Sequence, residues 1–172
     1  LPVTLPNCKA YTYDQMDRLI EMKAYQNIDA STNTWQNGSM YTGLYHNWFT
    51  YDANGNILTQ KRADEYGAVF DSLTYHYNVQ GQRTLQNRLY HINDAITSSI
   101  AGISDDIKNQ GTFNSNPLTI NQVNNYGYDP LGNLIRDNQE GIDTIIWSVY
   151  GKIRKIIRTS LSTKHDIEFQ YN

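Results

Sequence analysis

The sequence YGYDPLGNLI, at residues 126–135, is the stretch that decides the expected fold. Tyr126 and Tyr128 are separated by one glycine, so both rings would project from the same face of an extended strand. Tyrosine also favours strands, where its ring packs and its hydroxyl can reach a polar partner. The start of the stretch therefore predicts a β-strand.

The residues after this strand predict a tight turn. Asp129 suits the first turn position because its carboxylate can accept backbone N–H groups, and Pro130 has φ preset for the second position. Gly132 can adopt the positive φ of a bulge residue, which directs the chain into a returning strand at Leu134. The whole stretch thus predicts an antiparallel β-hairpin.

The same pattern recurs along the chain. Three other copies align on the tyrosine before an acidic or amide residue: YTYDQMDRLI at residues 11–20, FTYDANGNIL at 49–58 and YHYNVQGQRT at 75–84. A degenerate copy, WSVYGKIRKI at residues 147–156, aligns on its Tyr150, and a truncated copy, FQYN, occupies residues 169–172. Such recurrence is typical of a structural repeat, since a catalytic motif is normally present once.

The repeat predicts which residues form the turns. We expect turns centred on residues 15–16, 53–54, 79–80 and 130–131, with positive φ at Gly55, Gly81 and Gly132. In the first copy Asp17 replaces the glycine, and Asp tolerates the left-handed region better than most residues. The defining residues are Tyr13, Asp14 and Asp17, then Tyr51, Asp52 and Gly55, then Tyr77, Asn78 and Gly81, and finally Tyr128, Asp129 and Gly132.

These copies resemble the YD-repeat, or RHS-repeat, family, whose signature is a tyrosine–aspartate pair, two variable residues, a glycine and a polar residue. The match is specific in YDANGN (residues 51–56) and YDPLGN (128–133), and it extends more loosely over residues 10–172. The resemblance implies a mostly β fold of consecutive antiparallel hairpins that add edge to edge into a β-sheet spiral. Residues 1–172 would then form one segment of a partial shell.

The resemblance also implies a function and a set of partners. Members of this family occur in bacterial polymorphic toxins, insecticidal toxin complexes and teneurins, and complete members close into a hollow shell around a polypeptide, often a toxic C-terminal domain. The implied partners are the remainder of the RHS chain or an associated fragment, an enclosed toxin domain and a secretion machinery. The implied location is secreted or at the cell surface.

The composition of the chain limits the classes of protein to which it can belong. The chain has 172 residues, a net charge of −3 and only 18% charged residues, so an extended nucleic-acid surface is not expected. Its apolar runs are too short to predict insertion into a membrane. The 14 tyrosines and the glycines at turn spacing favour a β protein. Because the chain does not begin with Met and shows no signal peptide, we expect an excised piece or a processed product.

The longest insertion between copies, residues 93–125, leaves two interpretations open. Ile96, Ile100, Ile103 and Ile107 fall on one helical stripe, which predicts a short helix within residues 93–111. Thr97 and several serines in the same stretch are weak helix formers, which favours an irregular loop instead.

No residue constellation predicts catalysis, a metal site or a cofactor. The four histidines, His46, His76, His91 and His165, lack zinc-motif spacing, and His76 is expected to face solvent because it alternates with two tyrosines. Cys8 has no base that the sequence can place beside it. Asp129 begins a stretch, DPLG, that resembles the self-cleavage motif of family members; since it lies in register with a repeat, we interpret it as a turn, with cleavage as the alternative.

Two functions from different classes follow. The first is a non-catalytic structural segment of an RHS/YD-repeat shell that encloses or presents a polypeptide. The alternative is a cell-surface binding module that recognises carbohydrate or protein through exposed aromatic residues, because tyrosine serves both wall packing and ligand stacking.

Overall fold

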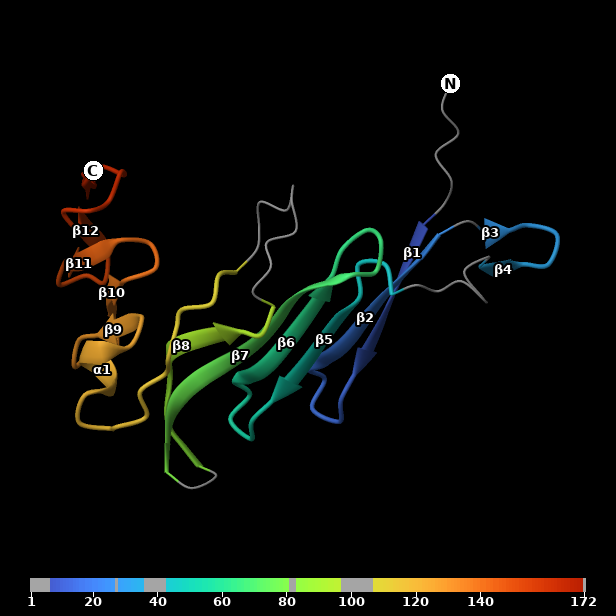
Figure 1. The fold of residues 1–172 in the computed structure, drawn as a ribbon, viewed down its shortest axis with the longest axis horizontal. Coiled ribbons are helices and arrows are strands. Elements are labelled where there is room, and N and C mark those ends of the chain that lie inside the picture. Colours follow the sequence, from blue (N-terminus) through green and yellow to red (C-terminus); the bar gives the residue numbers. More distant parts are fainter. Residues whose placement is uncertain (1–6, 27, 36–42, 81–82, 97–106, 172) are drawn as a thin grey trace. The chain divides into compact units, whose positions relative to one another are not determined.

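The computed structural model describes residues 7–26, 28–35, 43–80, 83–96 and 107–171. Antiparallel strands make up most of the described chain (Figure 1), which confirms the expected mostly β class. The chain divides into two compact units. The first unit comprises Leu1–Thr74 and Asp94–Asn109, and the second comprises Tyr75–Asn93 and Gln110–Asn172.

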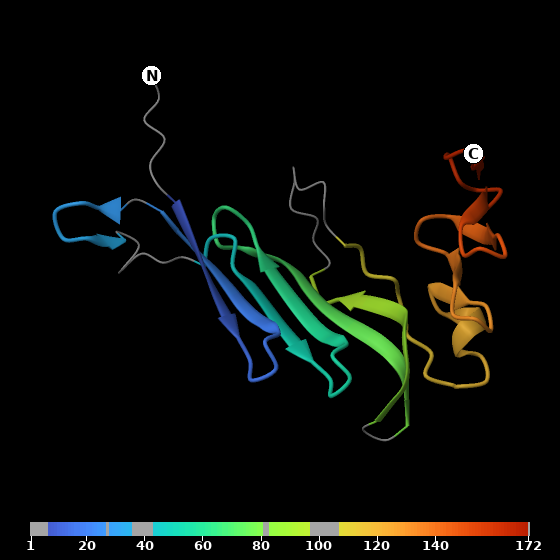
Figure 2. The same cartoon turned by 180° about the vertical axis from the view of Figure 1, so that it is seen from behind.

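The first unit is an antiparallel meander. It contains β1 (Asn7–Tyr13), β2 (Leu19–Gln26), β5 (Asn47–Tyr51), β6 (Ile57–Ala63) and the beginning of β7 (Val69–Gln80). The turns after β1 and β5 lie at one end of this meander, and the turn after β6 lies at the opposite end (Figure 2). A separate two-stranded ladder interrupts the path between β2 and β5 and is formed by β3 (Ile28–Asp29) and β4 (Thr34–Trp35).

The second unit contains the end of β7, most of β8 (Arg83–Asp94), a four-residue helix and a second antiparallel sheet. The strand order in this sheet is β13-β12-β11-β10-β9. Its elements are α1 (Ile120–Val123), β9 (Tyr126–Tyr128), β10 (Leu134–Asp137), β11 (Ile142–Trp147), β12 (Ile153–Arg158) and β13 (Ile167–Glu168).

The β1–β2 and β5–β6 hairpins each have a register shift where the leading strand meets the turn. The shift falls between Thr12 and Tyr13 in the first pair and between Thr50 and Tyr51 in the second. A shift of this kind is a β-bulge, in which the returning strand carries one extra residue, Ile20 in the first hairpin and Leu58 in the second. The repeat therefore encodes both a turn and the bulge that follows it.

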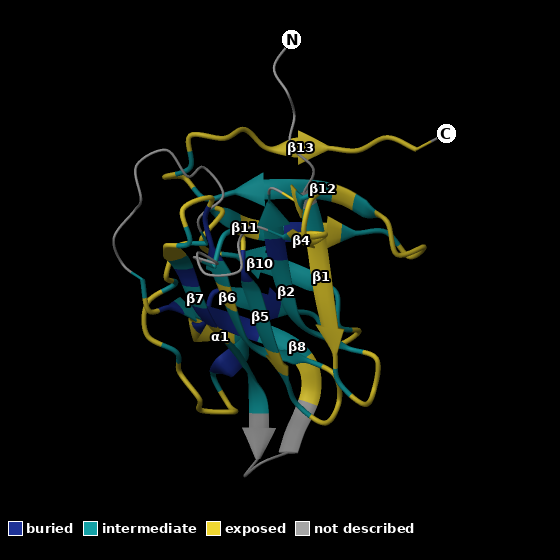
Figure 3. Cartoon of the chain, turned by 90° about the vertical axis from the view of Figure 1, so that its right-hand side faces the viewer, coloured by how far each residue is buried: buried dark blue, intermediate teal, exposed yellow. Residues whose placement is uncertain are grey.

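Few of the apolar side chains that the structure describes are buried in either unit, as the burial colouring in Figure 3 shows. In the first unit these are Ala24, Ala63 and Leu73, and in the second they are Tyr90, Ile92, Ile120 and Ile145. Many of the remaining tyrosines and isoleucines are half-buried on the sheets. Contacts between neighbouring hairpins must therefore carry much of the stability, because a thin core buries little apolar area.

The insertion contributes a helix outside the stretch in which one was predicted. Ile100 and Ile103 lie outside the described residues, and Ile107 lies in irregular chain, so the predicted helix in residues 93–111 stays untested over most of its length. The observed helix is α1, and it packs on β9. The side chain of Asn121 pairs with the backbone of Tyr128, donating to its carbonyl oxygen at 2.8 Å and accepting from its N–H at 2.7 Å.

This packing explains the glycine inside β9. A Cβ atom at Gly127 would lie 3.1 Å from the carbonyl oxygen of Asn121 and 3.3 Å from the guanidinium carbon of Arg136. Both neighbours are fixed, since Arg136 donates a 2.8 Å hydrogen bond to that same carbonyl oxygen. Gly127 therefore permits the helix backbone to approach the strand.

A fully buried asparagine joins the helix to the preceding loop. The Asn124 side chain accepts from the N–H of Asn114 at 2.9 Å and donates to the carbonyl oxygens of Asn114 and Ile120 at 2.8 and 3.0 Å. Because both polar atoms of the amide are satisfied, its burial is compatible with a stable core.

Candidate functional site

The repeat turns share one hydrogen-bond pattern, built around an aspartate. In each turn the aspartate N–H donates to the carbonyl oxygen four residues later, and its own carbonyl oxygen accepts from the residue three positions on. The carboxylate Oδ1 of Asp52 also accepts the N–H groups of Asn54 and Asn56 at 2.9 and 2.8 Å. Asp14 makes the equivalent bonds to Met16 and Arg18 at 2.8 and 3.0 Å. The aspartates therefore cap the turns, as the sequence predicted.

The second carboxylate oxygen holds the side chain at the end of the turn. Asp14 pairs with the guanidinium of Arg18 at 2.7 Å, and Asp129 accepts from the Asn133 amide at 2.8 Å. The backbone N–H of Arg18 is the largest influence holding the pKa of Asp14 below its usual value. For Asp129, the hydrogen bond from the Asn133 side chain lowers the pKa most. Both carboxylates are thus stabilised in their charged form.

The left-handed positions agree with the repeat wherever the structure describes them. Gly55 has φ of 88°, Gly132 has φ of 95°, and Asp17 adopts φ of 58° in place of a glycine. Gly81 lies outside the described residues.

The turn predicted at residues 79–80 is wrong. Strand β7 continues through Asn78 to Gln80, and β8 begins at Arg83, so these residues belong to a strand. The alternation around Tyr77 is not interrupted by an aspartate or a proline, and the strand therefore extends beyond the position at which the other copies turn. Asn78 is a strand residue rather than a turn cap.

A further turn of the same type follows β6 and was not predicted from the repeat. Asp64 caps it through the N–H groups of Tyr66 and Ala68, with Gly67 at φ of 83°. Alanine precedes Asp64, so an alignment on tyrosine missed this copy, although its Asp-x-x-Gly spacing was a usable signal.

The degenerate copy has a different alignment from the one predicted. Ser148 takes the aspartate position, since its N–H donates to the carbonyl oxygen of Lys152 at 2.7 Å and its own carbonyl oxygen accepts from Gly151 at 3.1 Å. Trp147 therefore occupies the tyrosine position. Tyr150 is instead an exposed residue at the tip of the turn.

Four aromatic residues of the repeat copies bind the backbone of a neighbouring segment. The Tyr51 hydroxyl donates to the carbonyl oxygen of Leu19 at 2.6 Å, and Trp147 Nε1–H donates to that of Leu134 at 2.8 Å. The same contact joins Tyr128 to Leu89 at 2.6 Å and Tyr171 to Ile153 at 2.7 Å. We call this set of four contacts the aromatic ladder.

A basic side chain lies over the ring at three of the four contacts. The guanidinium carbon of Arg18 is 4.8 Å from the centre of the Tyr51 ring, that of Arg88 is 5.8 Å from Tyr128, and Lys152 Nζ is 4.7 Å from Tyr171. Each basic residue directly precedes the residue whose carbonyl accepts the ladder hydrogen bond. A cation above an aromatic face is attracted by its quadrupole, so the ring and the hydroxyl bind two adjacent residues.

The environment keeps Tyr51 and Tyr128 protonated. Burial is the main cause that raises the pKa of Tyr51 above its usual value, and burial raises the pKa of Tyr128 to about 12. The hydroxyls therefore remain hydrogen-bond donors throughout the physiological pH range.

His76 does not face solvent as predicted. Its ring stacks on Phe113 with centroids 4.3 Å apart, and its Nε2 lies 2.7 Å from Asn93 Oδ1. The loop that carries Phe113 covers this face of the sheet, which strand alternation alone could not reveal. Burial is the chief cause that lowers the pKa of His76.

Two further histidines, His91 and His46, are buried, and burial likewise lowers the pKa of each. His91 is 2% exposed and lies 6.1 Å from His76 between ring centres; burial lowers its pKa. Its Nε2–H donates to the carbonyl oxygen of Gly111 at 3.2 Å, and its Nδ1 is buried without a partner among the described residues. In the first unit His46 stacks on Trp48, and burial lowers its pKa despite the hydrogen bond to Glu21 at 2.8 Å.

Two buried carboxylates were not singled out from the sequence. Asp71 is fully buried and pairs with Arg62 Nε, and burial raises its pKa. Asp94 is 4% exposed and accepts the N–H groups of Ser72 and Ile96, both at 2.9 Å. Side chains alternate between the two faces of a strand, so Asp71 lies on the same inner face as Leu73. This alternation could have predicted the burial of Asp71 from the sequence.

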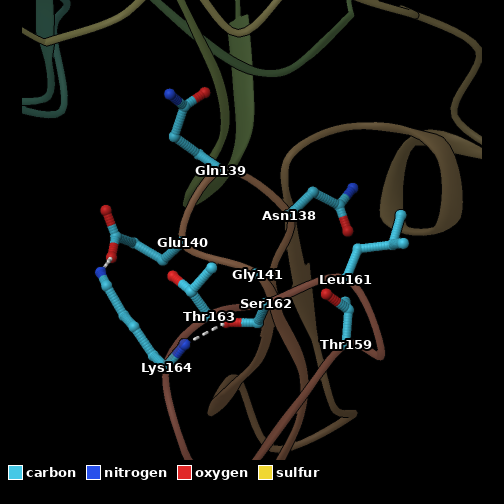
Figure 4. A pocket seen from close by; sticks show the side chains of 9 residues that line it. All are labelled: Asn138, Gln139, Glu140, Gly141, Thr159, Leu161, Ser162, Thr163 and Lys164. Atoms are coloured by element: carbon cyan, nitrogen blue, oxygen red, sulfur yellow. Dashed lines mark hydrogen bonds and ion pairs between the residues drawn. The ribbon is translucent and has the colours of Figure 1, made fainter.

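A pocket of about 540 Å³ lies between the β10–β11 turn and the segment after β12 (Figure 4). Glu140 and Lys164 close one side with an ion pair of 2.5 Å, and Asn138, Thr159 and Ser162 supply amide and hydroxyl groups. The pocket therefore presents neutral polar groups beside a charge pair that is already satisfied.

Among the described residues there is no group of three or more His, Cys, Asp or Glu side chains that could hold a metal ion. In the same part of the chain, no helix is long and apolar enough to cross a membrane. No protein-family model matches the chain, and a comparison with curated proteins finds no match.

Proposed function

We propose that this chain is a non-catalytic structural segment of an RHS/YD-repeat shell that encloses or presents a polypeptide, such as a C-terminal toxin domain. The observation that carries the proposal is the aromatic ladder. It repeats the same hydrogen bond at Leu19, Leu89, Leu134 and Ile153. A contact that joins one hairpin to the next suits a wall that grows by adding units.

The sheet edges give independent support. β1 and β13 are edge strands of their sheets, and Tyr11, Tyr13 and Ile167 on these strands are 50%, 56% and 40% exposed. Open edges with exposed apolar side chains favour pairing with further strands. Under this proposal the partners are the rest of an RHS chain or an associated fragment, an enclosed polypeptide and a secretion machinery, and the location is secreted or at the cell surface.

Size-exclusion chromatography with light scattering tests the structural proposal. The purified 172-residue chain should self-associate, because its edges lack the strands that a shell would supply. A matched variant with Tyr11→Lys and Ile167→Lys should self-associate less, since charged residues oppose strand addition at an edge. If the unmodified chain is a monodisperse monomer that melts cooperatively, the shell proposal should be abandoned.

A second function, recognition of carbohydrate or protein at a cell surface, is favoured by the turn tips of the second unit. Leu131, Val149 and Tyr150 are 88%, 94% and 87% exposed, although all three are apolar or aromatic. Exposed side chains of this kind can contact a ligand. Glycan-array binding that is lost in a Val149→Ser, Tyr150→Ser variant would favour this second function over the first.

A further inference from the structure

Every ladder aromatic contacts the same kind of two-residue unit. The pairs are Arg18–Leu19 at Tyr51, Arg88–Leu89 at Tyr128 and Lys152–Ile153 at Tyr171. At Trp147 the acceptor is Leu134, and the residue before it in sequence is the uncharged Asn133. In the charged pairs the first residue places a cation over the ring, and in all of them the second offers its carbonyl oxygen. Two of the contacts run across antiparallel strand pairs, β2 with β5 and β10 with β11, and a third joins β12 to Tyr171, which follows β13 in the chain.

Tyr13 occupies the equivalent position in the first hairpin. Like Tyr51, it ends the leading strand at the register shift and directly precedes a capping aspartate. Its hydroxyl has no hydrogen-bond partner among the described residues, and in that part of the chain β1 pairs only with β2. Tyr11 lies two positions earlier, as Phe49 lies before Tyr51, where the two rings stack with centroids 6.5 Å apart.

We infer that the outer edge of β1, at Tyr11 and Tyr13, binds an antiparallel β-strand that carries Arg or Lys followed by Leu or Ile. The inference rests on the proposed structural function and names the chemistry of the partner strand. Continuity with the ladder identifies this occupant. At each of the three ladder tyrosines a basic side chain lies over the ring and the next residue, Leu or Ile, accepts the hydroxyl hydrogen bond. The β1 edge presents a tyrosine ring and hydroxyl at the equivalent position of its hairpin.

Charge at the edge makes the recognition selective. A Lys or Arg over the Tyr13 ring gains a cation–π attraction, and Asp14 follows at the base of the turn. Asp52 follows Tyr51 in the same way, and there Arg18 also donates to the Asp52 carbonyl oxygen at 2.8 Å. The Tyr13 hydroxyl then pairs with a strand carbonyl oxygen that would otherwise lack a donor. A strand with an acidic residue in place of the cation would lose the attraction and be repelled by Asp14.

The test uses a hairpin taken from this chain as the probe. A fluorescent peptide of residues 9–24 contains Arg18 and Leu19, and because Lys9 and Ala24 are register partners, a D-Pro–Gly link between them closes the hairpin. Its binding to the immobilised 172-residue chain is measured by biolayer interferometry. Tyr13→Ala in the chain should weaken binding about tenfold or more, and Tyr13→Phe about threefold to fivefold, since one hydrogen bond is worth about 1 kcal/mol.

Matched substitutions distinguish the cation–π contact with the Tyr13 ring from non-specific peptide binding. Arg18→Gln in the peptide should weaken binding about threefold to fivefold, whereas Arg18→Lys should retain most of it. Tyr66→Ala in the chain removes a tyrosine that is 78% exposed but lies outside the ladder, and it should leave binding unchanged. Equal binding to the wild type and to Tyr13→Ala, or no binding at millimolar peptide, would overturn the inference.

Failure of the inference about the partner strand can be distinguished from failure of the proposed shell function. If the chain self-associates through its edges but the peptide is insensitive to Tyr13 and Arg18, the structural function stands and this partner chemistry is wrong. If the chain is a stable monomer whose β1 edge nevertheless binds the peptide selectively, the partner chemistry stands and the shell proposal fails.

Discussion

The hydroxyl of Tyr51 donates a 2.6 Å hydrogen bond to the carbonyl oxygen of Leu19, which lies 32 residues earlier in the chain. This bond connects the leading strand of one hairpin to the returning strand of the previous one. The ring is also covered by Arg18, so a single tyrosine side chain contacts two adjacent residues of the neighbouring hairpin.

Removing only the Tyr51 hydroxyl tests this role. Tyr51→Phe should lower the free energy of unfolding by about 1 kcal/mol, because the Leu19 carbonyl oxygen loses its donor in a part-buried environment. Tyr66→Phe is the control, since the Tyr66 side chain is 78% exposed and its hydroxyl has no partner in the described part of the chain. Urea unfolding followed by fluorescence measures both; equal stability of the two variants would show that the ladder bond contributes nothing.

Alanine substitutions at two turn glycines, Gly55 and Gly132, distinguish the cost of backbone strain from the cost of a steric clash. Gly55 has φ of 88° with open space where a Cβ atom would lie, whereas at Gly132, with φ of 95°, that atom would lie 3.1 Å from the Arg88 guanidinium. Gly55→Ala should therefore destabilise by about 1 kcal/mol from its backbone alone. Gly132→Ala should destabilise more, since it must also displace Arg88 from the Tyr128 ring. A larger loss at Gly55 in the same urea experiment would contradict this order.

The buried asparagine predicts a large local effect. Asn124→Ala removes the partners of the Asn114 N–H and carbonyl oxygen and of the Ile120 carbonyl oxygen. Leaving buried backbone groups unpaired should lower the free energy of unfolding by more than about 2 kcal/mol. Ser115→Ala, at an exposed position in the preceding loop, should change it by less than about 0.5 kcal/mol. Thermal melts of the two variants give the comparison.

Acid should weaken the second unit through its histidines. Burial lowers the folded-state pKa of both His76 and His91 below the usual value of 6.5. Well above pH 6.5 these residues are uncharged in the folded and unfolded states alike, so stability does not depend on their titration. Below pH 6.5 the unfolded chain binds protons before the folded chain does. The free energy of unfolding therefore decreases as the pH is lowered, until the pH reaches the folded-state pKa.

His91 should dominate this response because its buried Nδ1 has no acceptor for the added proton among the described residues. Hydrogen exchange of the Gln110 amide, which donates to the Ile92 carbonyl oxygen at 3.2 Å, should accelerate between about pH 7 and pH 5 after correction for intrinsic rates. His91→Gln should flatten this dependence, whereas His165→Gln, at an exposed site, should not. An unchanged profile in His91→Gln would assign the acid response to other groups.

The local structure of the repeat was predictable from the sequence. Asp14, Asp52 and Asp129 cap their turns, and the glycine positions that follow take left-handed conformations, because these properties depend on side chains and backbone within four residues. The mostly β class follows from the same local preferences. Prediction from the same pattern failed at Asn78, where an uninterrupted strand continued past the position of the expected turn.

The contacts of each tyrosine depend on the tertiary structure. The partners Leu19 and Leu89 lie far from Tyr51 and Tyr128 in sequence, so no local pattern links each tyrosine to its acceptor. Trp147 replaced Tyr150 as the ladder residue because strand pairing, not identity to tyrosine, selects the aromatic at the register shift. The partial burial of His76 and the full burial of Asp71 and Asn124 likewise depend on contacts with distant loop residues, among them Phe113, Ile107 and Asn114. Local periodicity does not specify long-range packing of this kind.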